Sequence, residues 1–99
     1  MDNYISKIPS HTLASIERYV NDGCPTGDFL HGMLTNDLAK AMWHADEQNL
    51  DAMRYIFMYI YNRIPMTCWG SKEKVAAWYA ERREKGPLDK VARQIALVP

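Results

Sequence analysis

Side chains that could ligate a metal ion are few and lie far apart in the sequence. The candidates are His11, Cys24, His31, His44 and Cys68. No C-x-x-C, H-x-x-H or H-E-x-x-H spacing occurs, although such spacings let one element present two ligands to the same ion. We therefore predict neither a metal site nor a bound cofactor. A metal site assembled only in three dimensions is the alternative that the sequence leaves open.

The sequence also offers little for covalent or acid–base catalysis. Cys68 is the one candidate nucleophile, and no G-x-S-x-G motif, cysteine-enzyme signature or glycine-rich phosphate loop accompanies it. Asp46, Glu47 and Asp51 bring carboxylates close together. Acids at this spacing are typical of a helix start, where they cap backbone N–H groups and favour the helix dipole. We therefore predict a protein without enzymatic activity.

The length and composition of the chain predict one small domain, residues 1–99. Apolar residues make up 47% of the chain and charged residues 24%, and the formal net charge is zero. Strong basic character would favour nucleic-acid binding and strong acidity a nucleic-acid mimic, so neutrality favours neither class. The polar start and the lack of an apolar run of about 18 residues predict no secretory signal and no membrane span. We expect a cytoplasmic protein with free thiols, while one disulfide stays open.

Proline and glycine divide a helical pattern that runs through most of the chain. A first helix is predicted over residues 10–21, with Ser10 as its N-cap and Gly23 as its stop. Residues 28–44 carry a second apolar face, formed by Phe29, Leu30, Met33, Leu34, Leu38, Ala41 and Met42. The polar triplet 35–37 leaves open whether this segment is one helix or two.

The most apolar segment is ambiguous between helix and strand. Residues 55–61 alone are rich enough in aromatic and β-branched side chains to form a buried strand. A period of 3.6 residues nevertheless extends over Leu50, Met53, Ile56, Phe57, Ile60 and Ile64. We therefore predict a helix over residues 47–64, capped by Asp46 and stopped by Pro65, in which Phe57 faces the same way as its neighbours Ile56 and Ile60.

Two further helices complete the predicted fold. Residues 71–85 place charged side chains around an apolar stripe, and residues 87–98 form an amphipathic segment that begins at Pro87. Five helices with short connections predict a compact all-α bundle with residues 47–64 as the central helix. A central helix must be apolar on several faces, although a partner that covers the segment would explain the same composition.

Two segments of the chain are candidates for nucleic-acid binding. Residues 28–42 could be the recognition helix of a helix-turn-helix. They hold two acids and a single Lys40, however, whereas a helix that lies against a phosphate backbone is expected to carry more positive charge. The end of the chain is more basic, through Lys72, Lys74, Arg82, Arg83, Lys85, Lys90 and Arg93. Because glutamates are interleaved, a solvated helix face explains this cluster, with weak nucleic-acid contact as the alternative function.

Large aromatic side chains are more numerous than one small core needs. They are Trp43, Tyr55, Tyr59, Tyr61, Trp69 and Trp78. Aromatic residues and methionine are enriched in protein interfaces. Trp69 lies in the loop that separates two predicted helices, where it either folds back onto the core or is exposed for binding.

The segment from Ile8 to Ser71 resembles a group of short bacteriophage and prophage reading frames. The shared pattern is I-P-x-x-T, Y-V-x-x-G, P-x-G-x-F-L, N-D-L, A-D-x-x-N and P-x-x-x-W-G-S, and every element occurs here. The resemblance carries no activity of its own. It implies a phage context, in which small proteins often block a host or defence complex by binding it, anti-CRISPR proteins among them.

The sequence thus predicts a phage-encoded inhibitor that acts by stoichiometric contact with a host protein or ribonucleoprotein complex. Its oligomeric state is left open. The expected contact surface combines the loop around Met66 and Trp69 with acidic side chains from the first two thirds of the chain. These acids are Asp28, Asp37, Asp46, Glu47 and Asp51.

Overall fold

Helices form almost the whole of residues 3–86, the part of the chain that the computed structural model describes. In chain order they are η1 (Asn3–Lys7), α1 (Ser10–Asp22), α2 (Asp28–Leu34), α3 (Leu38–His44), α4 (Glu47–Asp51), α5 (Met53–Arg63), η2 (Met66–Cys68) and α6 (Lys72–Lys85). η1 and η2 are 3₁₀-helices, and no strand occurs in this part. The all-α prediction is confirmed. The helix predicted over residues 87–98 lies outside the described residues.

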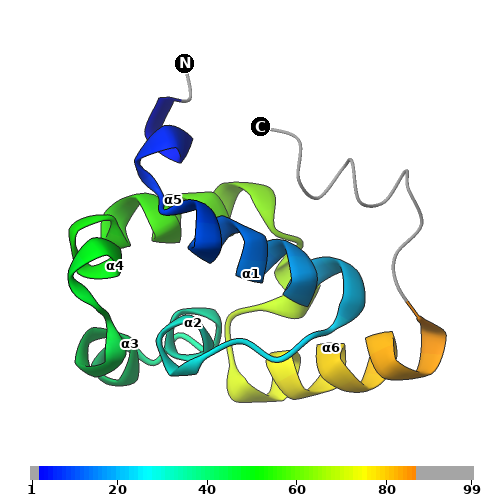
Figure 1. Cartoon of the computed structure of the whole chain (residues 1–99). Helices are drawn as coiled ribbons and strands as arrows, with labels where there is room; N and C mark the ends of the chain where they lie inside the picture. Colours follow the sequence, from blue (N-terminus) through cyan, green and yellow to red (C-terminus); the bar gives the residue numbers. More distant parts are fainter. Residues whose placement is uncertain (1–2, 87–99) are drawn as a thin grey trace.

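Helix α1 packs against α6 and supplies much of the core (Figure 1). Gly23 ends it as predicted, with a left-handed φ of 71°. The N–H of Gly23 bonds to the carbonyl of Tyr19 at 2.9 Å. The start differs from the prediction, because Pro9 occupies the cap position, its carbonyl accepts the first helical hydrogen bonds, and Ser10 is already helical.

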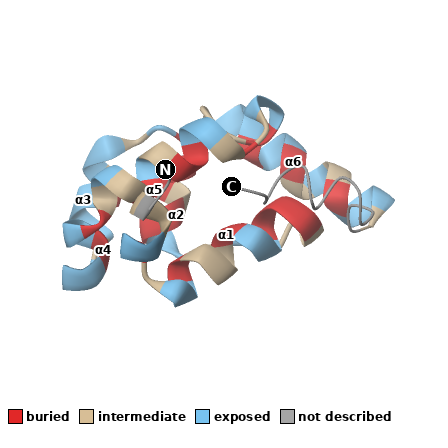
Figure 2. Ribbon diagram, turned by 90° about the horizontal axis from the view of Figure 1, so that it is seen from above, coloured by how far each residue is buried: buried red, intermediate tan, exposed pale blue. Residues whose placement is uncertain are grey.

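The core collects the inner faces of helices that are exposed on their other side (Figure 2). Its largest fully buried side chain is Tyr19, whose ring packs edge-on against that of Tyr79 with centroids 5.5 Å apart. The indole N–H of Trp78 donates to the carbonyls of Tyr19 and Val20, at 3.0 and 3.2 Å. These contacts attach α6 to α1.

The single helix predicted over residues 47–64 is divided into α4 and α5. Ala52 breaks it with φ −99° and ψ 5°. Asp46 caps α4 as predicted and accepts the N–H of Asn49 at 2.7 Å. The break lets α4 turn the buried Asn49 towards α1, where its side-chain oxygen accepts the hydroxyl of Thr12 at 2.6 Å, while α5 follows its own direction along the core.

The predicted orientation of Phe57 is wrong. Helix α5 buries Ile56, Tyr59 and Ile60, whereas 42% of Phe57 is exposed. Tyr59 takes the place on the buried face, and Phe57 shares the outer face with Tyr61, one helical turn further on. The most apolar segment is therefore buried on one side and left uncovered by residues 3–86 on the other.

Candidate functional site

A tight turn between α2 and α3 builds one wall of the site. The hydroxyl of Thr35 donates to the carbonyl of His31 at 2.7 Å, and Asn36 takes a left-handed φ of 62°. Asp37 then caps α3, accepting the N–H of Lys40 at 3.1 Å. The open alternative is thus resolved in favour of two helices, because the polar triplet ends one helix and starts the next.

Helices α2 and α3 touch where Gly32 meets Ala41. A Cβ atom on Gly32 would lie 2.6 Å from the backbone nitrogen of Ala41, closer than side-chain atoms normally come. Ala41 is fully buried by this contact. Leu38 and Met42, which were expected on the core face, are instead 69% and 50% exposed, because the turn rotates α3 relative to α2.

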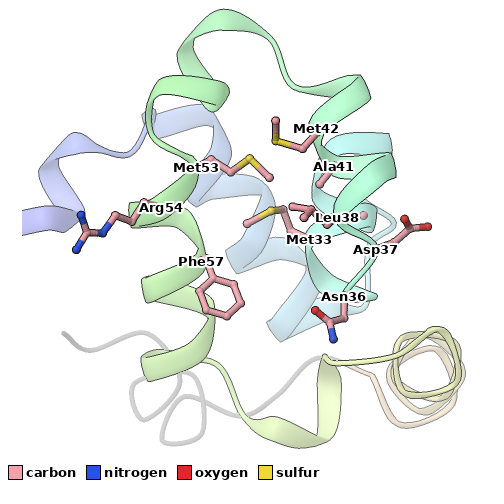
Figure 3. Close-up of a pocket in the computed structure, with 10 residues that line it drawn as sticks. Met33, Asn36, Asp37, Leu38, Ala41, Met42, Met53, Arg54 and Phe57 are labelled. Carbon is pink, nitrogen blue, oxygen red and sulfur yellow. The ribbon is translucent and has the colours of Figure 1, made fainter.

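An apolar groove separates α3 from α5 (Figure 3). Its volume is about 380 Å³. We call it the methionine groove, and it is lined by Gly32, Met33, Asn36, Asp37, Leu38, Ala41, Met42, Met53, Arg54 and Phe57. Figure 3 shows the side chains of Met33, Met42 and Met53 converging between the two helices, with the ring of Phe57 at one end.

A second, smaller hollow lies beside the groove. It has a volume of about 220 Å³ and is lined by Tyr61, Met66, Trp69, Gly70 and Lys74. Phe57 connects the two hollows. It lines the first, and the centroid of its ring lies 5.9 Å from the ring centroid of Tyr61 and 6.1 Å from that of Trp69, which both line the second. Most of the exposed large apolar side chains of α3, α5 and η2 thus border two adjoining hollows, and Trp43 is the exception.

The loop that carries Met66 and Trp69 is held by hydrogen bonds to the core. The N–H of Gly70 donates to the carbonyl of Leu34 at 2.7 Å, and the carbonyl of Cys68 accepts the Tyr19 hydroxyl at 2.6 Å. Trp69 is half-buried and packs against the core, while its neighbour Met66 is exposed. Trp69 therefore folds back onto the core, which is one of the two sequence alternatives, and it also lines the second hollow. A role in binding stays a prediction.

The residues predicted to bind a partner are distributed unevenly over these features. Asp37 lines the methionine groove, and Met66 and Trp69 line the second hollow. Asp28 lies elsewhere, with a carboxylate oxygen 3.9 Å from Nδ1 of His44. Three other acids, all exposed and all lining neither hollow, belong to α4 or cap it; they are Asp46, Glu47 and Asp51.

Sequence reasoning missed most of the groove. Leu38 and Met42 were assigned to the core, Phe57 was turned inward, and Arg54 was not singled out. An available signal was the spacing of Leu38 and Met42, which continues the α2 stripe only if residues 28–44 form one straight helix. The left-handed Asn36 breaks that continuity.

The reactive side chains do not converge in the described part of the chain. Within residues 3–86, no three His, Cys, Asp or Glu side chains come together as metal ligands would. Cys24 and Cys68 are both free thiols, and burial raises the pKa of Cys68 to about 12, so this thiol stays protonated at neutral pH. Burial, together with the Lys40 ammonium 2.9 Å from its Nδ1, lowers the pKa of His31.

The basic C-terminal cluster is partly structural. Arg82 is buried, stacks over the ring of Trp78 at 4.9 Å and binds the Glu81 carboxylate at 2.9 Å. Its guanidinium is thus not available to a phosphate backbone, which weakens the nucleic-acid alternative. Lys90 and Arg93 lie outside the described residues. Among residues 3–86, no helix combines the length and apolar character that crossing a bilayer demands.

No protein-family model matches the chain, and searches of curated proteins and of solved structures found no match either.

Proposed function

We propose that this protein is a non-enzymatic binding domain whose partner covers the methionine groove and the adjoining second hollow. The observation that carries the proposal is the series of exposed large apolar side chains along their borders. Leu38, Met42, Phe57, Tyr61 and Met66 all belong to it, and each lines one of the two hollows. In a soluble monomer, single exposed apolar residues are ordinary, but a contiguous group marks an interaction site.

The energetics of burial support this reading. Tyr61 and Met66 are 63% and 72% exposed, so most of their surface is in contact with water. Covering a large apolar side chain completely contributes roughly 1.5–3 kcal/mol, and several together offset the entropy lost on association. Methionine also adapts its shape to a partner at low cost. The surface therefore suits protein recognition.

The resemblance to phage reading frames supports a more specific form of the proposal. In that form the protein inhibits a host defence complex, as anti-CRISPR proteins do, by stoichiometric contact in the host cytoplasm. Exposed acids on and beside α4, namely Asp46, Glu47 and Asp51, could add contacts to a basic surface such as that of a ribonucleoprotein. The apolar surface would supply affinity and the acids orientation.

The test is capture from a host lysate with a matched control. Met42→Glu places a charge in the groove at an exposed position, so the fold should survive. Ala80→Glu places the same charge at an exposed position of α6 that lines neither hollow. We expect the wild type and Ala80→Glu to retain a stoichiometric partner, and Met42→Glu to lose at least about tenfold in affinity for it.

The captured complex also tests inhibition. Its activity should fall to zero at about one wild-type molecule per complex, and Met42→Glu should leave it active. Circular dichroism of all three proteins controls for folding. If no stoichiometric partner is retained, or if the three proteins retain it equally, the proposal is wrong.

A further inference from the structure

The methionine groove has two helical walls that differ in charge. Helix α5 contributes Met53, Arg54 and Phe57, and helix α3 contributes Leu38 and Met42, preceded by its cap Asp37. We propose that its occupant is an amphipathic α-helix of the partner protein, with a carboxylate placed to pair with Arg54. This inference rests on the proposed function and specifies the chemistry of the partner.

The size of the groove fits one helix face. Helix α3 has seven residues and is therefore about 10 Å long, or two turns. A guest helix that lies along it can place anchors at i, i+3 or i+4, and i+7, which is the usual pattern of helix-in-groove recognition. The volume of about 380 Å³ accommodates a few apolar side chains from such a face.

The lining fits apolar anchors. Met33 is buried and forms the floor, while Met42 and Met53 come from opposite walls. Unbranched thioether side chains repack around different anchors at little cost, as they do in other proteins that bind amphipathic helices. The aromatic ring of Phe57 closes one end and offers a flat contact surface.

Charge orients the guest helix. Arg54 is exposed and forms no ion pair or hydrogen bond with the described residues 3–86. Figure 3 shows the Arg54 side chain extending from α5 away from α3 and the Asp37 carboxylate pointing away from α5, so the two charges flank the groove on its outer sides. One carboxylate oxygen of Asp37 already accepts the N–H of Lys40. A guest helix seated in the groove therefore meets these charges from its two edges, with an acid on the α5 edge for the free guanidinium of Arg54 and a base on the α3 edge for Asp37.

Two other occupants fit less well. An extended peptide binds by adding a strand to an open sheet edge, and residues 3–86 contain no strand to extend. A second copy would have to insert its own α3 into the groove, and this helix, LAKAMWH, carries no acid to pair with Arg54. A convex helix from a different protein fills the groove instead.

The experiment is a selection from random 16-residue peptides on the immobilised full-length protein, with Met42→Glu as the counter-selection. We expect the enriched peptides to carry large apolar residues at i, i+3 or i+4, and i+7, with Asp or Glu beside them. Synthetic copies should become helical on binding, as measured by circular dichroism. Arg54→Glu should weaken them about tenfold, and replacing the peptide acid by Arg should restore binding to that variant.

Several results would overturn this inference. They are alternating apolar spacing in the enriched peptides, unchanged binding by Arg54→Glu, or no enrichment over Met42→Glu. A concentration-dependent dimer that Met42→Glu abolishes, seen by analytical ultracentrifugation, would assign the groove to a second copy. The proposed function fails separately, because lysate capture that depends on Met42 would still show a binding surface even if its occupant is not a helix.

Discussion

The hydroxyl of Tyr19 donates a 2.6 Å hydrogen bond to the backbone carbonyl of Cys68. The two residues lie 49 positions apart, one in the middle of the core and the other at the end of η2, directly before Trp69. Because both groups are buried, neither can exchange its partner for water. The bond therefore fixes the loop of the second hollow to the interior of the domain.

Removal of this hydroxyl should destabilise the fold. Tyr19→Phe keeps the ring but leaves the Cys68 carbonyl buried without that partner, so we expect a loss of about 1–3 kcal/mol in the free energy of unfolding. Urea denaturation measures it. Tyr61→Phe is the control, because this exposed tyrosine should lose nothing measurable. Equal stability of the two variants would contradict the role given to the Tyr19 bond.

Gly32→Ala should also destabilise, against the ordinary preference of helices for alanine. Alanine in a helix interior usually gains up to about 1 kcal/mol over glycine. Here its Cβ would meet the backbone of Ala41 at 2.6 Å, and helix α3 would have to move, at a cost of about 1–3 kcal/mol. Thermal denaturation should thus show a lower midpoint.

Gly27→Ala provides the comparison for Gly32→Ala. Apart from Gly27 itself and its two neighbours in the chain, no residue has an atom within 4 Å of a Cβ at this position. The Gly27→Ala substitution should change the free energy of unfolding by no more than about 1 kcal/mol, because it alters only the helix cap and the entropy of the unfolded chain. A Gly32→Ala protein that is as stable as Gly27→Ala would mean that α2 and α3 do not pack as described.

The two thiols should differ in reactivity. Cys24 is half-buried, whereas Cys68 is fully buried and donates its S–H to the carbonyl of Pro65 at 3.1 Å. At pH 8 we expect an aromatic disulfide reagent to label one thiol per native molecule and two in denaturant. Cys24→Ser should remove the native signal. Rapid native labelling of that variant would contradict the burial of Cys68.

Stability should fall in alkali because of Cys68. Burial raises its pKa from 9.0 to about 12, so the folded state keeps a proton that the unfolded chain releases. The stability that the protonated Cys68 thiol contributes is complete below pH 9. It is lost as the pH rises towards 12, by up to about 1.4 kcal/mol of unfolding free energy per pH unit. Urea denaturation at several pH values should show a shallower loss for Cys68→Ala than for the wild type.

Fluorescence quenching should separate the three tryptophans. Trp43 is 85% exposed, Trp69 is half-buried and Trp78 is buried. Iodide should quench the wild type through Trp43 first, and Trp43→Phe should remove most of the accessible emission. The remaining partial quenching should belong to Trp69, and a partner at the second hollow should protect it. Unchanged quenching in Trp43→Phe would place α3 differently.

Local rules account for much of the fold. Gly23 and Pro65 end helices, Asp46 begins one, and the helix over residues 71–85 starts one residue later, capped by Ser71. Each of these outcomes depends on side chains within a few residues of the boundary, so the sequence contains the information directly.

The candidate site depends on angles that local patterns do not encode. The left-handed Asn36 and the break at Ala52 each change the direction of the chain, and the stripe that faces the core changes with it. Whether Phe57 or Tyr59 turns inward depends on the elements that pack against α5, among them η1 and α4, and not on the sequence of α5 alone. The groove arises from these orientations, which is why sequence patterns place Leu38, Met42 and Phe57 in the core instead.

The η2 loop is held by main-chain atoms, through the carbonyl of Cys68 and the N–H of Gly70. These anchors make no demand on the exposed side chains of Met66 and Thr67. Mutation can therefore exchange those two residues from lineage to lineage while the loop keeps its path. A protein that must follow a changing target could diversify there without having to refold.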